Sequence, residues 1–171
     1  MAELDELLQS GFRYAFSLTH DRGEAEDLLQ EACASILRVE GPWTKGYLFS
    51  SIRNRFIDAY RRDQRLTLLT LESIELEIEE ADEHPFADSV RSGVLQQALA
   101  TLRPEEREVL FLMFVEGYTA SEIAELTGRP RGTVLSLAHR ARQKLREILI
   151  ASRWRSSDSH QSSLRVSRAA I

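Results

Sequence analysis

The sequence predicts an all-α protein in which an acidic linker joins two small helical domains, the second of which contains a helix-turn-helix. Three observations lead to this prediction. Apolar side chains recur every three or four residues through most of the chain, which is the spacing of one helix face. The first 65 residues show no alternation typical of a strand. Residues 66–90 carry eight acidic side chains and neither Lys nor Arg, a charge of −8.

The first domain, residues 1–65, is predicted to contain three helices. Apolar residues at helical spacing define the first helix over about 4–16. Asp21 is a candidate N-cap for the second helix, because its short carboxylate can accept a free backbone N–H of the first turn. The Gly-Pro pair at 41–42 interrupts the chain, so we expect the third helix over 44–62.

The second domain, residues 91–150, follows the linker of residues 66–90. Pro104 suits the first position of a helix, where its missing N–H costs nothing. Thr119 and Glu122 have the spacing of a capping box, which marks another helix start. Four helices are therefore predicted, over about residues 94–102, 104–114, 119–126 and 130–150.

The remaining composition excludes several classes of protein. Residues 151–171 are rich in Ser and Arg and predict a disordered tail. One cysteine and four scattered histidines offer no metal-ligand spacing, so we expect no metal and no cofactor. The longest apolar run, 109–115, is far shorter than the roughly 18 residues of a membrane span. The shortness of that run leads us to expect a cytoplasmic protein. Neither a Gly-rich phosphate loop nor a nucleophile–base motif is present, so we do not expect an enzyme.

The net charge of −5 hides two basic segments. Residues 45–65 carry a charge of +4, and residues 129–155 carry +7, one on each side of the acidic linker. Such asymmetry says more about partners than the sum does, and here it favours two surfaces for nucleic acid.

The strongest functional signal lies in residues 119–146. A short capped helix, a tight turn at Gly128 and a longer basic helix have the pattern of a helix-turn-helix. In that motif the second helix enters the DNA major groove, and the small or hydroxylated residues at its start, Thr133 and Ser136 among them, allow a close approach. The alternative is an ordinary helical hairpin with a solvated basic face.

A second signal is the alternation of aromatic and basic residues over 47–62. Aromatic rings can stack on unpaired bases while neighbouring cations hold phosphates, which is what capture of a single strand requires. The alternative is that these aromatic residues fill a core, as aromatic residues at helical spacing usually do. The acidic stretch over 20–31 likewise fits either helix capping or a surface for a basic partner.

Taken in order, these residues resemble the extracytoplasmic-function (ECF) sigma factors of bacteria over about residues 4–150. Two blocks carry the resemblance, the first over 21–32 and 46–62, the second over 102–110, 116–128 and 132–142. The family implies a protein that binds core RNA polymerase and recruits it to a promoter. Inhibitory anti-sigma factors are a further expected partner.

The resemblance assigns roles to three sets of residues. The surface for the polymerase clamp helices is implied at Glu26, Asp27, Leu28, Gln30 and Glu31. Capture of the −10 DNA is implied at Trp43, Tyr47, Phe49, Arg53, Asn54, Arg61 and Arg62. Recognition of the −35 DNA is implied at Arg129, Arg131, Thr133, Ser136, His139 and Arg140.

The chain departs from the family pattern at two positions of the last helix. Leu135 and Leu137 stand where the family usually has Lys or Arg, so two potential contacts to DNA are missing. These leucines leave open a rival interpretation, a sigma-like decoy that sequesters an anti-sigma factor without productive DNA binding. The retained basic residues of 53–62 favour a promoter-specific initiation factor.

Overall fold

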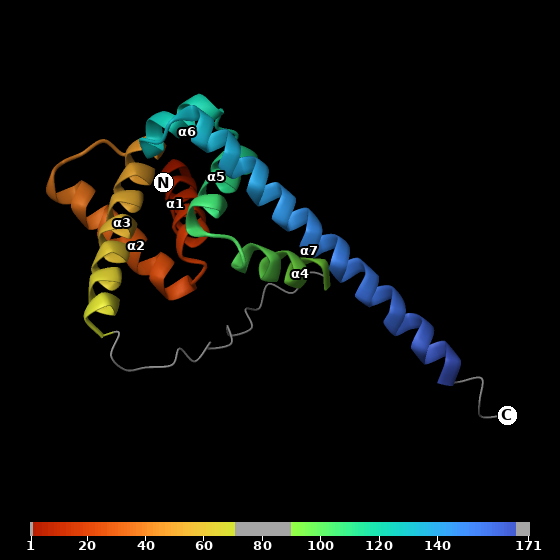
Figure 1. Ribbon diagram of the computed structural model, residues 1–171. Helices are drawn as coiled ribbons and strands as arrows, with labels where there is room; N and C mark the ends of the chain where they lie inside the picture. The colour runs from red at the N-terminus through yellow and green to blue at the C-terminus, as the bar shows by residue number, and fades with distance from the viewer. Residues whose placement is uncertain (1, 71–89, 167–171) are drawn as a thin grey trace.

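The computed structural model describes residues 2–70 and 90–166, and within them the chain forms seven α-helices and no strand (Figure 1). The helices are α1 (Ala2–Thr19), α2 (Arg22–Arg38), α3 (Lys45–Thr70), α4 (Val90–Ala100), α5 (Pro104–Phe114), α6 (Ala120–Thr127) and α7 (Arg131–Val166). The all-α fold class is confirmed. None of the described helices is long and apolar enough to cross a membrane.

Local capping explains where several helices begin and end. The Asp21 carboxylate accepts the backbone N–H of Glu24 at 2.8 Å and starts α2. The Thr119 hydroxyl and the Glu122 carboxylate cap each other's backbone N–H at the start of α6. The Thr119 backbone N–H and, next, the Thr119 hydroxyl donate to the Glu122 carboxylate and hold the pKa of Glu122 below its usual value. Gly128 ends α6 with φ of +68°, a left-handed conformation that glycine adopts without a Cβ clash.

Two helices extend beyond their predicted ends. α3 continues past residue 62 to Thr70, so the first residues of the predicted linker, 66–70, are helical. Its last residue, Val90, begins α4, and residues 71–89 lie outside the described residues. α7 continues to Val166, where a disordered tail was predicted from residue 151. The physical reason is shared: neither 47–70 nor 133–166 contains Gly or Pro, and an established helix gains one hydrogen bond for each residue it adds.

The two predicted domains share one hydrophobic core. α1 packs against α2 and α3 on one side and against α5 on the other (Figure 1). Tyr14 of α1 stacks on Phe49 of α3 with ring centroids 4.4 Å apart, and Phe111 of α5 lies 5.9 Å from the Tyr14 ring. Val134 and Leu137 of α7 belong to the same buried cluster. The residues on either side of the linker therefore form one packed unit.

α5 lies at the centre of this unit, and three consecutive charged residues of α5 are buried. Glu106 binds Lys144 of α7 at 2.9 Å, while Arg107 donates to the backbone oxygens of Ser17 and Leu18 at the end of α1. Burial raises the pKa of Glu106, but the bonds from Lys144 and from the Arg103 backbone outweigh it and leave the pKa lowered. The third charged residue, Glu108, faces the candidate site.

Candidate nucleic-acid interface

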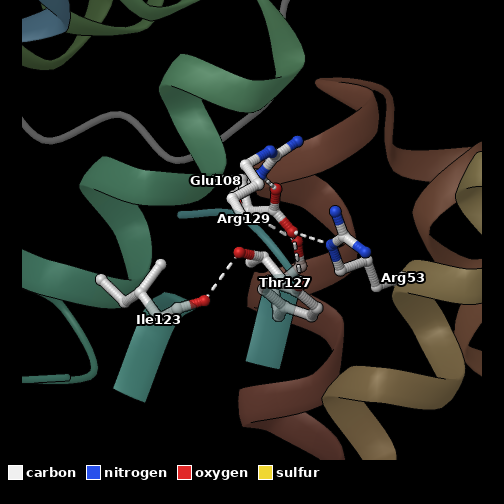
Figure 2. Close-up of polar contacts among 7 residues, drawn as sticks. Arg53, Glu108, Ile123, Thr127 and Arg129 are labelled. Carbon is white, nitrogen blue, oxygen red and sulfur yellow. Dashed lines mark hydrogen bonds and ion pairs between the residues drawn. The ribbon is translucent and has the colours of Figure 1, made fainter. Parts of the chain in front are cut away.

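The helix-turn-helix places most of its predicted DNA residues on an exposed face of α7. Val134, Leu137 and Ala141 are buried and fix the opposite face of this helix. The Thr127 hydroxyl of α6 donates to the Ile123 oxygen at 2.7 Å, next to the turn (Figure 2). The exposed residues among those predicted to read −35 DNA are Arg131, Thr133, Ser136, His139 and Arg140.

The two leucines that depart from the family pattern have different environments. Leu137 is 8% exposed and packs in the shared core, so it does not form an external surface. Leu135 is 43% exposed and lies near the start of α7 among the predicted DNA residues. Only Leu135 therefore places an apolar side chain where a cation could reach DNA.

The predicted −10 residues divide between two faces of α3. Tyr47, Asn54 and Arg61 are seven residues apart, about two helical turns, so they share one face, and all three are exposed. Arg62, next to this face, is also exposed, as is Trp43 just before the helix. An aromatic, an amide and two cations are thus available together on one side of α3.

Phe49 and Arg53 lie on the inner face of α3. This face is turned toward the second half of the chain, α4–α7, where the first half is α1–α3. Phe49 is fully buried, and its ring packs near Tyr14, Phe111 and Tyr118. The Arg53 side chain is 13% exposed. In this arrangement neither side chain is available to a DNA strand, unlike the exposed set.

One buried carboxylate joins the inner face of α3 to the helix-turn-helix. Glu108 of α5, with a side chain 2% exposed, accepts hydrogen bonds from Arg53 Nε at 2.9 Å and from Arg129 Nη1 at 2.5 Å. Figure 2 shows the two arginines approaching this carboxylate from different elements. The Tyr14 hydroxyl donates to it as well, at 2.7 Å. Two residues predicted to touch different promoter elements are thus bound to the same side chain.

The sequence did not single out Glu108 or Tyr14 as functional residues. A signal for Glu108 was present, because charged residues 105–108 run directly into the apolar residues 109–115 and leave that helix without one polar face. The sequence gives no such indication for Tyr14, because an aromatic residue on an apolar helix face is predicted to be a core residue.

The predicted polymerase surface lies on α2. Glu26, Asp27, Gln30 and Glu31 are exposed, whereas Leu28 is 8% exposed and packs in the core. Glu26 pairs with Arg22 at 2.9 Å and Glu31 with Arg55 at 3.1 Å. Exposed pairs of this kind contribute little to stability, so both acids remain accessible to a basic partner.

An apolar groove of about 550 Å³ lies where α1, α4, α5 and α7 meet. Its walls include Phe12, Phe16, Leu95, Leu99, Phe114 and Leu145. None of the residues predicted to bind polymerase or DNA lines it. The groove is therefore separate from the predicted polymerase and DNA surfaces. No group of acidic, His and Cys side chains among the described residues has the arrangement of a metal site.

Comparison with known proteins matches each half of the chain to a different region of the sigma-70 factors. The family described as Sigma-70 region 2 matches residues 4–66, and the family described as Sigma-70, region 4 matches residues 92–145. The chain is 34% identical over 160 residues to the ECF RNA polymerase sigma factor SigE of Mycolicibacterium smegmatis, covering 87% of this chain. It spans 62% of the length of that relative.

Two further similarities cover most of both chains. The RNA polymerase sigma-E factor of Streptomyces coelicolor is 34% identical over 159 residues, which is 86% of this chain and 81% of the relative. The solved structure of the sigma factor RpoE from Bartonella quintana, in complex with the anti-sigma factor NepR, has a TM-score of 0.72 at 28% identity. That similarity covers 86% of this chain and 94% of the other.

Proposed function

Because the chain belongs to the ECF group of RNA polymerase sigma factors, we propose that it binds core RNA polymerase and directs initiation at promoters. The observation that carries this proposal is the pair of polar helix faces, one on α3 and one on α7. They lie in the two segments that match different sigma regions, so a single chain can address two DNA elements. The protein would act in the cytoplasm and catalyse no reaction of its own, and nothing in this role requires a cofactor.

The exposed face of α3 is suited to the −10 element. Tyr47 can stack on an unpaired base, and Arg61 can hold the adjacent phosphate. Asn54 lies between them on the same face and can hydrogen-bond a base edge. Trp43 adds a second exposed ring beside this face. The combination fits a strand whose bases have been unstacked better than it fits an intact duplex.

The exposed face of α7 is suited to the −35 duplex. Thr133 and Ser136 lie near the start of the helix, which is the part of a recognition helix that meets base edges. Arg131 and Arg140 flank them and can pair with phosphates or with guanine. Leu137 belongs to the core, so the rival decoy interpretation retains only Leu135 as support.

The polymerase surface is proposed on the exposed acids of α2. Asp27 offers a clean test, because its side chain is exposed and its removal leaves the core intact. Leu28 does not, because a change there would create a cavity in the core. By analogy with the Bartonella quintana structure, we also propose that an anti-sigma factor regulates this protein.

The decisive experiment is run-off transcription with core RNA polymerase and the promoters selected by the holoenzyme from a genomic library. We expect promoter-dependent transcripts with the wild-type chain. Asp27→Ala should weaken association with core polymerase, whereas Glu125→Ala, an exposed acid on α6, should not. Stable core binding without a promoter-dependent transcript would contradict the proposal and support the decoy.

A further inference from the structure

The bonds to Glu108 link two predicted DNA surfaces inside the free protein. Arg53 comes from the half that matches sigma region 2, and Arg129 comes from the turn of the helix-turn-helix in the half that matches region 4. Glu108 itself belongs to α5 and is 1% exposed (Figure 2). A single negative charge therefore engages two positive charges, each of which is needed elsewhere if the protein binds DNA.

Both carboxylate oxygens of Glu108 have hydrogen-bond donors. One carboxylate oxygen of Glu108 accepts from Tyr14 and Arg53, and the other accepts from Arg129. Within the described part of the chain, no buried side-chain polar atom lacks a partner. Burial, and next the charge of Glu108, raise the pKa of Tyr14 well above its usual value, so its hydroxyl stays protonated and keeps donating.

A second carboxylate of the same segment repeats this arrangement. Glu116, just after α5, accepts from Lys45 Nζ at 2.7 Å and from the Ser10 hydroxyl at 3.0 Å. Both donors belong to the first half of the chain, and the Glu116 side chain is 4% exposed. The two halves are thus held together by acids of the second half that bind donors of the first. Only the Glu108 site also captures a residue of the helix-turn-helix.

We propose that Glu108 is an internal competitor of DNA: its bond to Arg53 holds the two halves closed, and its bond to Arg129 occupies a cation of the helix-turn-helix, until polymerase or DNA replaces it. This inference rests on the proposed function, because it assigns both arginines to DNA phosphates. Either arginine can leave Glu108 only if the halves separate or the turn shifts. Arg53 leaves when the halves separate, which exposes the carboxylate to water, whereas Arg129 belongs to the same half as Glu108 and leaves when the turn shifts.

The test uses the full chain with Glu108→Gln, which keeps the shape of the side chain and removes its charge. Two quantities are measured: the radius of gyration by small-angle X-ray scattering, and affinity for a random-sequence 30-base-pair duplex at fixed salt. We expect a larger radius and tighter binding. If the closed form outnumbers the open form about tenfold, affinity rises by up to about tenfold, because only the open fraction binds.

Glu125→Gln is the matched control. Glu125 is exposed on α6, in the same half of the chain, so this variant removes the same charge without touching the buried site. It should leave the radius unchanged and alter affinity only by the small general effect of one charge. An equal gain in affinity for both variants would overturn the proposal, since net charge alone would then explain it.

Tyr14→Phe provides a second route if Glu108→Gln folds poorly. It keeps the ring that stacks on Phe49 and removes one hydrogen bond to Glu108. Since neither arginine is altered, it should change the radius and the affinity in the same direction as Glu108→Gln, by a smaller amount. Circular dichroism of each variant verifies its helix content first.

Arg129→Gln completes a double-mutant cycle. In the wild-type background Arg129 must give up its bond to Glu108 before it can bind DNA, so its net contribution to binding is small and its removal changes the affinity little. In the Glu108→Gln background Arg129 has no such charged partner to give up, and the same change weakens binding by the full contact. If the effects of the two substitutions on affinity simply add, the proposal that Glu108 competes with DNA is overturned. It is also overturned if Glu108→Gln is as compact as the wild type and binds DNA as weakly. Failure of run-off transcription alone would instead count against the proposed sigma function, since the radius is measured without DNA.

Discussion

Arg107 provides the sharpest test of how the two halves are joined. Its guanidinium donates to three backbone oxygens, those of Ser17 at 2.9 Å, Leu18 at 2.8 Å and Leu102 at 2.6 Å. Ser17 and Leu18 are in the last turn of α1, where carbonyls have no partner within the helix and a cation is favoured by the helix dipole. Arg107 is 8% exposed, so its removal leaves these oxygens largely without water.

Arg107→Met keeps the apolar stem and removes the donors. At about 1 kcal/mol for each of three hydrogen bonds, the free energy of unfolding should fall by roughly 3 kcal/mol. The loss is measured by urea denaturation followed by circular dichroism. Because the core is shared, we expect the wild type to unfold in one transition.

The control for this change is Arg13→Met. Arg13 is exposed on α1, and substitutions at such positions usually change stability by less than about 0.5 kcal/mol. If both variants lose the same small amount, the hydrogen bonds from Arg107 to Ser17 and Leu18 do not join the halves, and the reasoning is refuted. A loss near 3 kcal/mol for Arg107→Met alone supports it.

Three further predictions concern pH and DNA. Burial, and next the charge of Arg107, lower the pKa of His20, so the unfolded chain takes up a proton more readily than the folded protein. The free energy of unfolding should therefore decline as the pH falls below about 6.5, the pKa of a histidine in the unfolded chain. His20→Asn should flatten this dependence on pH. An equal decline in the wild type and the variant would contradict the prediction. Leu135→Lys should add a phosphate contact and steepen the plot of log affinity against log salt by about 0.9, as measured by fluorescence anisotropy. Arg140→Ala should make that plot shallower by about 0.9, and an unchanged slope would show that Arg140 does not face DNA.

The helices were predictable because their signals are local. Asp21, Thr119 and Gly128 cap or end a helix through contacts within a few residues, which a sequence displays directly. The end of α7 was not predictable in the same way. Its Ser- and Arg-rich composition resembles that of a disordered tail, whereas the helix continues because nothing after residue 132 breaks it.

The candidate site was predictable only in part because burial depends on distant contacts. Helical spacing places Tyr47, Asn54 and Arg61 on one face, and Phe49 and Arg53 on another, but it does not reveal which face meets a second domain. That choice depends on α5, far along the chain. Successive residues on a helix point about 100° apart, so the buried Glu106, Arg107 and Glu108 reach three different neighbours. A sequence shows their charges but not those neighbours.

The bonds to Glu108 also make a prediction about the wild-type protein, because coupling between two equilibria is reciprocal. If closing the halves weakens DNA binding, then DNA must favour the open form by the same factor. Saturating the full chain with the 30-base-pair duplex should therefore separate the halves, which is measured as a longer distance between fluorophores attached through cysteines in α2 and α6. The native Cys33 is first replaced by Ser in both the wild type and Glu108→Gln.

The response of Glu108→Gln to DNA distinguishes this coupling from a simple change of shape. Since that variant is already open, DNA should lengthen its distance much less than that of the wild type. An equal lengthening in both proteins would mean that DNA separates the halves without displacing Glu108. In that event the buried carboxylate would only hold the folded halves together. Arg53 and Arg129 would then stabilise the fold and would not be released to bind DNA.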